Sequence, residues 1–484
     1  MTAPQPSPLR KIPSVDLVLQ EAEAEHAGQG LPRRILADCA RRAVEEVRER
    51  LRKHLAQMGT VPFFPPGTSD ASPEAIRADI FARLRQAIRA AAGPHYRKVI
   101  NATGIILHTA LGRAVLPAKA LRQIEEELSG YSLLQADVAT GQRSRRDERI
   151  QWLLAQLTGA EAATVVNNNA AATSIVLNTV ANGKEVIVSR GQLVEIGGSF
   201  RLPEVMAASG AKLVEVGTTN KTHPTDYERA ITPNTAAILR VHPSNYKITG
   251  FTSEVPLEEL VRIARQRNVL VIDDVGAGAL IDFSRFGFDK EPTLRESIQA
   301  GADLVTCSAD KLIGGAQGGI ILGKADLVQA VRKNPMARIV RVGKLTLAAL
   351  EATLTLFLDE RVALREVPTL RMLCRSIAEI AGQAERIAAA LAGRVCGAEI
   401  AVIEGYSQTG SGSLPTQGLA TRLVAVTPRS ISPDELARRL RQSSPPIFAR
   451  IHKGQVLLDP RTLLEGEEEV LVNGLVEVLS KKDD

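Results

Sequence analysis

Short apolar runs rich in β-branched residues alternate with longer polar segments through the middle of the chain. These runs are AATVVN (162–167), EVIVSR (185–190), AAILRV (236–241), NVLVIDD (268–274), DLVTCSA (303–309) and GGIILG (318–323). Such runs are typical of strands that are buried on both faces. The segments between them, such as 254–267 and 290–300, have helical length and polarity. The pattern predicts an α/β fold in which helices cover a mostly parallel sheet.

A different pattern precedes this region. Residues 31–55 show the helical period, and their apolar side carries Ile35, Cys39, Val44, Val47, Leu51 and Leu55. The opposite face holds more arginine and lysine than acidic residues. It is either an ordinary solvated face or a surface for a polyanion. The four prolines of VPFFPPGTSDASPE (61–74) end this helix and predict a domain boundary, and a further helix is expected at roughly 73–92.

Helical periodicity returns at about 344–394, and short strands and helices alternate from about 398 onward. We therefore expect a smaller α+β domain at the C-terminal end. The predicted division is a helical N-terminal domain (1–60), a linker and helix (61–98), a large domain (99–355) and a small domain (356–484).

Composition narrows the class of protein. The 60 Lys and Arg against 54 Asp and Glu give a net charge of +6, which is compatible with a polyanionic partner. The four cysteines share no close spacing, so they suggest neither a zinc site nor a disulfide framework and favour a reducing cytoplasm. The N-terminus has no apolar stretch of the signal-peptide type, and the uncharged segment 163–183 is interrupted by asparagines. No signal peptide or membrane span is expected.

The stretch VTCSADKLIGGAQGGIILG (305–323) places an acid and a lysine between two apolar runs. Burial at this position would lower the pKa of the Lys311 amine and make it a nucleophile for a carbonyl group. A Schiff base with pyridoxal phosphate explains the placement, whereas an exposed, solvated lysine is the ordinary alternative.

Such a cofactor also needs an anion beside its ring nitrogen. The run NVLVIDD ends in Asp273 and Asp274, and carboxyl ends of parallel strands line the ligand crevice of an open α/β sheet. Because side chains alternate along a strand, only one of the two can face the crevice. Asp274 is the candidate, since it begins the looser DVGAG loop; a role as a helix cap is the alternative.

The cofactor phosphate needs hydrogen-bond donors. The chain passes directly from strand to helix through Asn168, Asn169 and Ala170, so free N–H groups and the positive end of a helix dipole would meet an anion there. Ser308 could add a hydroxyl from a neighbouring strand end. Asn245, in RVHPSNYKITG, is placed to reach the phenolic oxygen of the ring. Together, one signal at each strand end, these residues favour a fold-type-I pyridoxal phosphate enzyme.

Longer composite motifs make the comparison specific. They are VINATGIILHTALGRA (99–114), VVNNNAAA, VSRGQLVEIGGSFRLPEVM (188–206), VGTTNKTHPTDY, VHPSNYKITGFT, DDVGAGALIDFSRFG, SADKLIGGAQGGIILGK, KLTLAALEATL and SQTGSGSLP. Over nearly its whole length the chain resembles bacterial selenocysteine synthase, L-seryl-tRNA(Sec) selenium transferase. The resemblance implies a pyridoxal phosphate-binding large domain of fold type I, a small C-terminal α+β domain and a helical N-terminal domain.

The resemblance also implies roles for single residues. Lys311 is the cofactor lysine, Asp310 is a candidate proton-transfer group, and Arg113, Arg338 and Arg341 line the site for a phosphate-bearing selenium donor. Arginine binds phosphate oxygens in a bidentate manner, which suits the two guanidinium groups of RIVRVGK. Solvation at the surface is the alternative for Arg338 and Arg341.

The implied reaction converts seryl-tRNA(Sec) to selenocysteinyl-tRNA(Sec). Water is eliminated from the seryl group, and selenium from selenophosphate then adds to the β-carbon of the aminoacrylyl-tRNA. Sequence does not decide whether Lys311 or Asp310 moves the proton. In the family the region before the cofactor core grips the tRNA, and the enzyme is cytoplasmic and assembles as a homodecamer of catalytic dimers.

Three alternatives stay open at this point. The first is a pyridoxal phosphate lyase or transferase acting on a small amino acid or amino sugar phosphate, against which residues 1–60 argue. The others are a non-catalytic tRNA-binding protein and the same chemistry with a sulfur donor. The stretch YSLLQADV (131–138) departs from the family's YSNLEYDL, which leaves nearby substrate or subunit contacts undecided. Arg190 and Gln192 are candidates for stacking on the ring.

Overall fold

The computed structural model describes residues 8–25, 29–56, 72–198, 200–243, 245–414 and 417–480. The chain forms two compact units. One comprises Met1–Val99, Gln442–Pro446 and Leu475–Asp484, and the other comprises Ile100–Arg441 and Ile447–Gly474. Most of the proline-rich segment 61–74 lies outside the described residues. The fourfold domain division stays a prediction.

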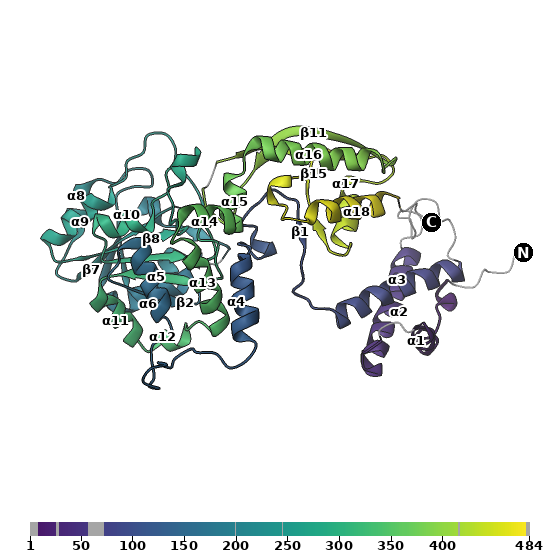
Figure 1. Cartoon of the computed structure of the whole chain (residues 1–484), viewed down its shortest axis with the longest axis horizontal. Coiled ribbons are helices and arrows are strands. Elements are labelled where there is room, and N and C mark those ends of the chain that lie inside the picture. Colours follow the sequence, from purple (N-terminus) through teal and green to yellow (C-terminus); the bar gives the residue numbers. More distant parts are fainter. Residues whose placement is uncertain are drawn as a thin grey trace, which may run out of the picture. The chain divides into compact units, whose positions relative to one another are not determined.

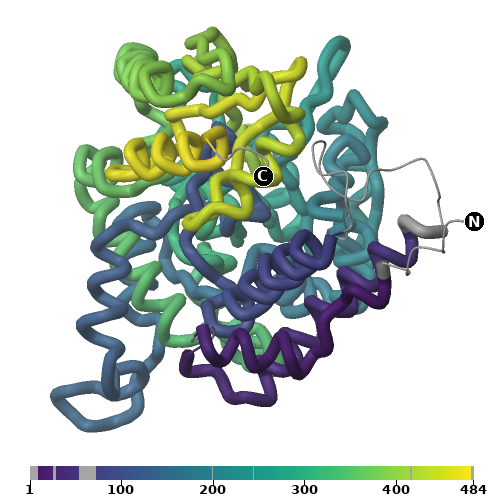
Figure 2. The backbone as a smooth tube through the Cα atoms, turned by 90° about the vertical axis from the view of Figure 1, so that its right-hand side faces the viewer, coloured from purple at the N-terminus to yellow at the C-terminus, as the bar shows by residue number. Residues whose placement is uncertain are grey.

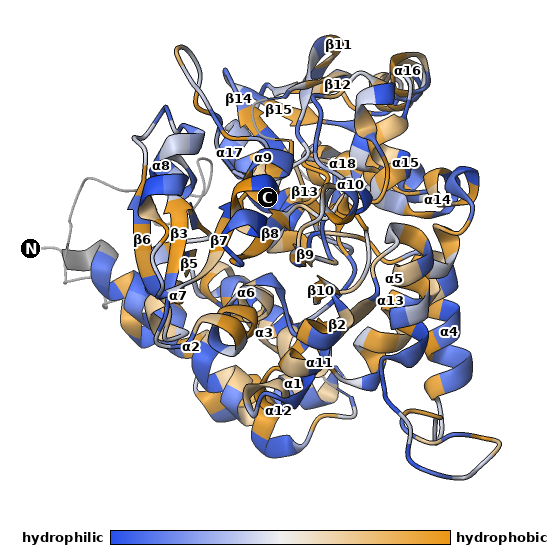
Figure 3. Ribbon diagram, turned by 90° about the vertical axis from the view of Figure 1, so that its left-hand side faces the viewer, coloured by the Kyte–Doolittle hydropathy of each residue, from blue (hydrophilic) through white to orange (hydrophobic). Residues whose placement is uncertain are grey.

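The larger unit contains a seven-stranded sheet (Figures 1 and 3). Its order is β2 (Ala162–Val166), β10 (Gly319–Gly323), β9 (Leu304–Ser308), β8 (Leu270–Gly276), β7 (Thr235–Val241), β3 (Glu185–Ser189) and β6 (Lys212–Val216). Only β10 runs antiparallel to its neighbours among these strands, so the predicted mostly parallel sheet is confirmed. Six of the strands coincide with the predicted runs. The run KLVEV of β6 was missed, because this edge strand exposes Lys212 and Glu215 and lacks a continuous apolar pattern.

The register of the sheet brings three strand ends together. Asp274 on β8 pairs with Val241 on β7 and with Thr306 on β9. Since these strands are parallel, the residues that follow them emerge at the same edge of the sheet.

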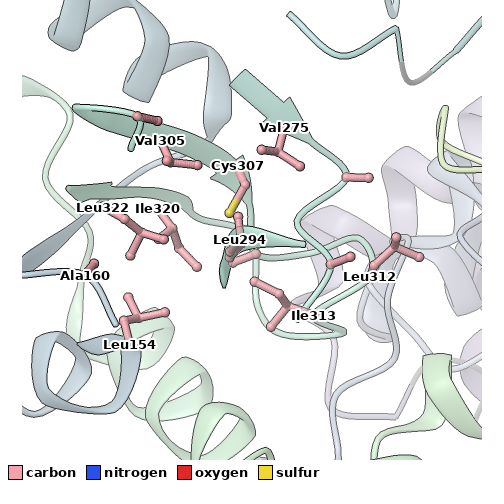
Figure 4. Close-up of a cluster of buried hydrophobic side chains, with 14 of the residues drawn as sticks. Leu154, Ala160, Val275, Leu294, Val305, Cys307, Leu312, Ile313, Ile320 and Leu322 are labelled. Atoms are coloured by element: carbon pink, nitrogen blue, oxygen red, sulfur yellow. The ribbon is translucent and has the colours of Figure 1, made fainter. Parts of the chain in front are cut away.

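Helices cover both faces. One face packs against α5 (Glu148–Thr158), α9 (Leu257–Gln266), α10 (Leu294–Ala300) and α13 (Lys344–Leu356), and the other against α6 (Asn169–Ala181), α7 (Leu202–Ala208) and α11 (Ala325–Lys333). Figure 4 shows part of the first apolar cluster, in which Leu312 and Ile313 join Val305, Cys307 and Ile320. Each large aliphatic side chain buried in this way stabilises the fold by about 1.5–3 kcal/mol.

A four-stranded antiparallel sheet forms the C-terminal part of this unit. Its order is β11 (Ala398–Ser407), β12 (Leu419–Pro428), β15 (Gln455–Leu458) and β14 (Arg450–His452), with α16 (Ile377–Ala392) against β11 and β12. The expected C-terminal α+β arrangement is therefore present. The remaining elements with a bearing on the fold are α4 (Ala118–Leu128), α8 (Pro224–Ala230), α12 (Met336–Ile339), α14 (Glu360–Glu366), α15 (Pro368–Cys374), α17 (Pro433–Arg441), α18 (Glu467–Ser480), β1 (Ile100–Asn101), β4 (Glu195–Ile196), β5 (Phe200–Arg201) and β13 (Ile447–Phe448).

A long loop joins α4 to α5. Figure 2 shows it as a blue segment that extends away from the neighbouring helices. Asp137 shapes its tip by accepting hydrogen bonds from the backbone and hydroxyl of Thr140, both at 2.7 Å. Tyr131, Leu133 and Val138 are strongly exposed here. The family departure YSLLQADV therefore falls on an exposed surface.

The N-terminal unit is helical, as predicted. It contains α1 (Val15–Ala24), α2 (Arg33–Ala56) and α3 (Pro73–Ala92), and its core includes Cys39, Val44, Val47 and Leu51 from the predicted apolar side of α2. The side chain of Leu55 lies outside the described residues. Part of the basic face of α2 is paired, since Arg50 contacts Asp79 of α3 at 3.0 Å. Glu46 of α2 in turn contacts Arg83 of α3 at 2.7 Å. No helix in the described part of the chain is long and apolar enough to cross a membrane.

Candidate functional site

A cavity of about 470 Å³ lies at the carboxyl ends of β7, β8 and β9. Most of the predicted site residues line it, namely Arg113, Asn168, Asn169, Ala170, Asn245, Asp274, Ser308, Asp310 and Lys311. The parallel register explains most of this convergence, because all of these residues except Arg113 follow or end a strand of one sheet.

Lys311 is buried, with 6% of its surface exposed. It follows β9, and the next residues, Leu312 and Ile313, are fixed in the apolar cluster of Figure 4. Burial lowers the pKa of the Lys311 amine, and the nearby positive charge of Arg113 lowers it further. The charges of Asp274 and Asp310 act in the opposite direction. The neutral amine is therefore easier to reach here than at the protein surface.

Arg113 holds the carboxylate next to this lysine. Its guanidinium donates a hydrogen bond to Asp310 Oδ2 at 2.8 Å. The backbone of Arg113 is in the left-handed region (φ 61°) and follows Gly112, which also has a positive φ. Such a conformation costs a non-glycine residue free energy and is often found at functional sites. The turn directs the Arg113 side chain toward Asp310.

Asp274 is held by the helix that follows β2. Asn169 Nδ2 donates to Asp274 Oδ1 at 2.8 Å, and the Thr173 hydroxyl donates to Oδ2 at 3.2 Å. Burial raises the pKa of Asp274, while the hydrogen bond from Asn169 opposes that rise. A cationic group in the cavity would therefore stabilise the ionised form of this carboxyl.

Asp273 faces away from the cavity. Its carboxylate accepts from Arg240 at 3.0 Å and from the Ser297 hydroxyl at 2.6 Å. The alternation of the strand thus separates the two neighbouring acids, with Asp274 alone of the pair at the cavity wall.

The first turn of α6 forms an N–H-rich cradle. Asn168 is its N-cap and accepts from Ala171 N at 2.9 Å. The Oδ1 atom of Asn169 is buried and has no hydrogen-bond partner within the described residues. Gly319 on β10 makes the close approach possible, because a Cβ atom there would lie 2.1 Å from Asn168 O. The glycine of GGIILG therefore permits the turn that carries the asparagines.

Sequence reasoning missed the part of the cavity wall that comes from the C-terminal motif SQTGSGSLP. Leu107 N donates to Thr409 O at 2.7 Å, and the Ser411 hydroxyl donates to Leu107 O at 2.6 Å and contacts the Thr109 hydroxyl at 3.0 Å. This pairing of distant segments brings Thr109, Ser411 and Gly412 to the cavity. The other lining residues that were not predicted are Val194, Ile196, Gly197, Phe200, Val241, His242, Gly276 and Gln317.

The structure places Arg338 and Arg341 elsewhere: both are exposed and neither lines this cavity. Both lie close enough to Arg146 for their charges to act on it. Burial lowers the pKa of Arg146, and the positive charge of Arg341 lowers it further. Their segment is nevertheless tied to the end of β2, since Asn167 N donates to Val340 O at 2.9 Å.

Three further candidates make other contacts. Asn245 lines the cavity, but its Nδ2 donates to Glu195 O at 2.8 Å. Arg190 pairs with Glu215 at 3.1 Å, and Gln192 accepts from Val241 N at 3.1 Å. Neither Arg190 nor Gln192 lines the cavity, whereas Phe200 does.

In the described part of the chain no cluster of three or more His, Cys, Asp or Glu residues could hold a metal ion.

Comparison with known proteins agrees with this geometry. Residues 99–464 match the family model for L-seryl-tRNA selenium transferase, and residues 9–48 match the model for the selenocysteine synthase N-terminal region. The L-seryl-tRNA(Sec) selenium transferase of Desulfomicrobium baculatum is 45% identical over 98% of this chain and 99% of its own length. That of Geobacter sulfurreducens is 43% identical over 97% of this chain and 99% of its own length.

A solved structure of D-glucosaminate-6-phosphate ammonia-lyase superposes with a TM-score of 0.55, covering 82% of this chain and 99% of that one at 21% identity. At this identity the likeness concerns the fold alone, and it confirms the predicted α/β class. The chain belongs to the L-seryl-tRNA selenium transferase family, whose enzymes convert seryl-tRNA(Sec) to selenocysteinyl-tRNA(Sec).

Proposed function

We propose that this conversion takes place in the cavity around Lys311, with pyridoxal 5'-phosphate as cofactor and selenophosphate as selenium donor. One observation carries the proposal: a buried amine with a lowered pKa shares a single cavity with a buried carboxylate and the N-terminal turn of a helix. These are the three groups that the cofactor's aldehyde, ring nitrogen and phosphate require.

The residues present fit this cofactor. Lys311 would hold its aldehyde carbon covalently, and Asp274 would face the ring nitrogen. The first turn of α6, from Asn168 to Ala170, would bind the phosphate with Ser308. The close approach allowed by Gly319 supports a cradle shaped for a ligand. Asn245 remains the candidate for the phenolic oxygen.

When bound, pyridoxal phosphate withdraws electrons from the α-carbon of the seryl group and so makes its α-proton acidic. The protein must then provide a base for that proton. The amine of Lys311 is suited to this role because burial lowers its pKa. Asp310 is the alternative base, held in place by Arg113. In either case Arg113 orients the acid beside the lysine.

The donor's phosphate calls for cationic groups. Arg113 is at the cavity wall and one-third exposed, so it can meet an entering anion. We propose that Arg338 and Arg341 assist as part of the exposed positive group around Arg146, as the family resemblance implies. Their position outside the cavity favours a role in collecting the anion.

The serine carboxyl is esterified to tRNA, so recognition of the substrate falls on the RNA. We propose that the N-terminal helices contact tRNA phosphates through those basic side chains of α2 and α3 that remain exposed. The homodecamer of catalytic dimers remains a prediction.

A transfer assay tests the proposed function. Purified protein with pyridoxal phosphate is given radiolabelled selenophosphate and seryl-tRNA(Sec), with free serine and thiophosphate in parallel reactions. Selenium should enter the aminoacyl-tRNA, and free serine should give no product. Lys311→Ala should abolish transfer, while Lys333→Ala, an exposed lysine on α11, should not. Transfer that survives Lys311→Ala, or product from free serine only, would overturn the proposal.

A further inference from the structure

A histidine at the cavity wall and a buried glutamate that faces it have no role in the chemistry proposed so far. His242 directly follows β7 and lines the cavity, and Glu291 precedes α10. His242 Nδ1 and Glu291 Oε2 are 3.5 Å apart. This separation is slightly longer than a hydrogen bond, and neither atom has another hydrogen-bond partner within the described residues.

Both side chains are buried. Glu291 is 5% exposed and His242 is 19% exposed. Leaving a buried polar atom unsatisfied is unfavourable, so two such atoms that face each other call for an explanation beyond packing. The pair can close its gap by a small rotation of either side chain.

The surroundings leave the pair with one transferable proton near neutral pH. Burial lowers the pKa of His242 to about 4, and the charge of Arg240 adds to this. Burial raises the pKa of Glu291 to about 7, and the negative charge of Asp289 adds to the rise. A backbone hydrogen bond from Leu414 and the positive charge of Lys311 oppose it. At and below neutral pH the proton therefore resides mainly on the carboxyl, beside a neutral imidazole. The imidazole can pass a proton on from its other ring nitrogen while Nδ1 takes up the proton of Glu291.

The pair is also connected to a loop that lines the cavity. Asp289 N donates to Gln417 Oε1 at 2.9 Å, and Gln417 Nε2 donates to Gly287 O at 3.0 Å. These bonds fix the segment of Glu291 to the C-terminal loop that brings Ser411 and Gly412 to the cavity. On the other side, the amine of Lys311 interacts electrostatically with Glu291. His242 of this pair thus lines the same cavity as Lys311.

The reaction needs a group that can protonate the departing oxygen. When the β C–O bond of the seryl group breaks, the electron pair leaves with oxygen, and hydroxide is a poor leaving group without a proton. We propose that the His242–Glu291 pair delivers this proton, so that the oxygen departs as water. His242 is the group that meets the substrate, and Glu291 is a positioning residue that reloads it. The pair regains its proton from solvent before the next turnover. This inference rests on the proposed function.

A change of leaving group tests the pair. Chloride departs without a proton, so β-chloroalanyl-tRNA(Sec) bypasses the need for an acid, whereas seryl-tRNA(Sec) does not. In single-turnover β-elimination, His242→Asn should slow loss of water from the seryl substrate by roughly 10²-fold or more and spare loss of chloride from the chloroalanyl substrate. Glu291→Gln should show the same selectivity with a smaller loss. His242→Gln serves as a second variant, and melting temperature and cofactor absorbance report that each variant is folded and loaded.

A spectroscopic measurement complements the rates. The infrared band of a protonated carboxyl should be present in the wild-type protein near neutral pH and be lost in Glu291→Gln. It should persist in Glu351→Gln, a half-buried glutamate on α13 that does not line this cavity. Equal losses on both substrates in folded variants, or no loss on the seryl substrate, would overturn the role of the pair. Failure of the wild-type protein on both substrates would instead overturn the proposed function, and this inference with it.

Discussion

The guanidinium of Arg113 donates to the carboxylate of Asp310 at 2.8 Å, across 197 positions of sequence. This contact joins a left-handed turn near the start of the large unit to the residue before Lys311. It has two effects on the lysine. It fixes the neighbouring acid, and it places a positive charge that lowers the pKa of the amine.

The charge of Arg113 should therefore control how readily Lys311 reacts. A neutral amine is required for attack on an aldehyde, so the rate of pyridoxal phosphate uptake by the apoprotein should rise with pH. Arg113→Ala removes a charge that lowers the pKa of Lys311 and should move this profile to higher pH. Arg113→Lys keeps the charge and should leave the profile in place. Stopped-flow absorbance measures both, and an unmoved profile in Arg113→Ala would contradict the electrostatic role.

Asp274 should affect chemistry more than cofactor attachment. Asp274→Asn preserves size and can still hydrogen bond to Asn169, but it removes the negative charge that favours a protonated ring nitrogen. The variant should retain cofactor on Lys311 and lose dehydration of seryl-tRNA(Sec) by roughly 10²-fold or more. Cofactor absorbance and single-turnover rates distinguish the two effects. Unchanged dehydration would show that another group faces the ring nitrogen.

The close contact at Gly319 gives a steric prediction. Gly319→Ala would place a methyl group 2.1 Å from Asn168 O, so the first turn of α6 must shift. We expect a loss of stability of about 1–3 kcal/mol and weaker binding of pyridoxal phosphate. Gly130→Ala is the matched control, because a Cβ atom there meets nothing within 4 Å. Denaturant unfolding and cofactor titration compare the two variants. Equal stability and equal cofactor affinity would contradict the role of Gly319 in shaping the first turn of α6.

Glu291 should make stability depend on pH. Its pKa is raised to about 7 in the folded chain, so between its unfolded value and about 7 the folded state binds more protons. The corresponding stability is present at low pH and is lost as pH rises through about 7. His242, whose pKa is lowered to about 4, acts in the opposite sense at lower pH.

Glu291→Gln should therefore gain stability relative to the wild type between about pH 5 and about pH 8, by at most roughly 3 kcal/mol. Melting temperatures of both proteins at equal cofactor loading measure the difference. A constant offset across this range would show that Glu291 does not titrate there.

Much of the cavity could be predicted because the carboxyl ends of parallel strands line the ligand crevice of an α/β sheet. Asp274, Ser308 and Lys311 each lie at the end of a strand whose apolar run is visible in the sequence, and parallel strands present their ends at one edge. The turn at Asn168 follows from the same logic. The residue types and their positions were sufficient there because these residues all follow or end strands of one sheet.

Other parts depend on packing between distant segments. Ser411 reaches the cavity through backbone pairing with residues near Leu107, and no local pattern signals that pairing. Glu291 carries no motif and is placed by the loop that contacts Gln417. His242 could have been found, since it is the first residue after β7 and stands three positions before the chosen Asn245. Arg338 and Arg341 were assigned by family resemblance, and their exposed position could not be read from the sequence.

The central claim concerns the covalent bond between Lys311 and pyridoxal phosphate. The purified protein, loaded with the cofactor, is reduced with borohydride, digested and analysed by mass spectrometry. The cofactor's mass should be found on the peptide that contains Lys311, and the absorbance of the bound cofactor should be bleached. Label on another lysine, or a protein that takes up no cofactor, would contradict the account.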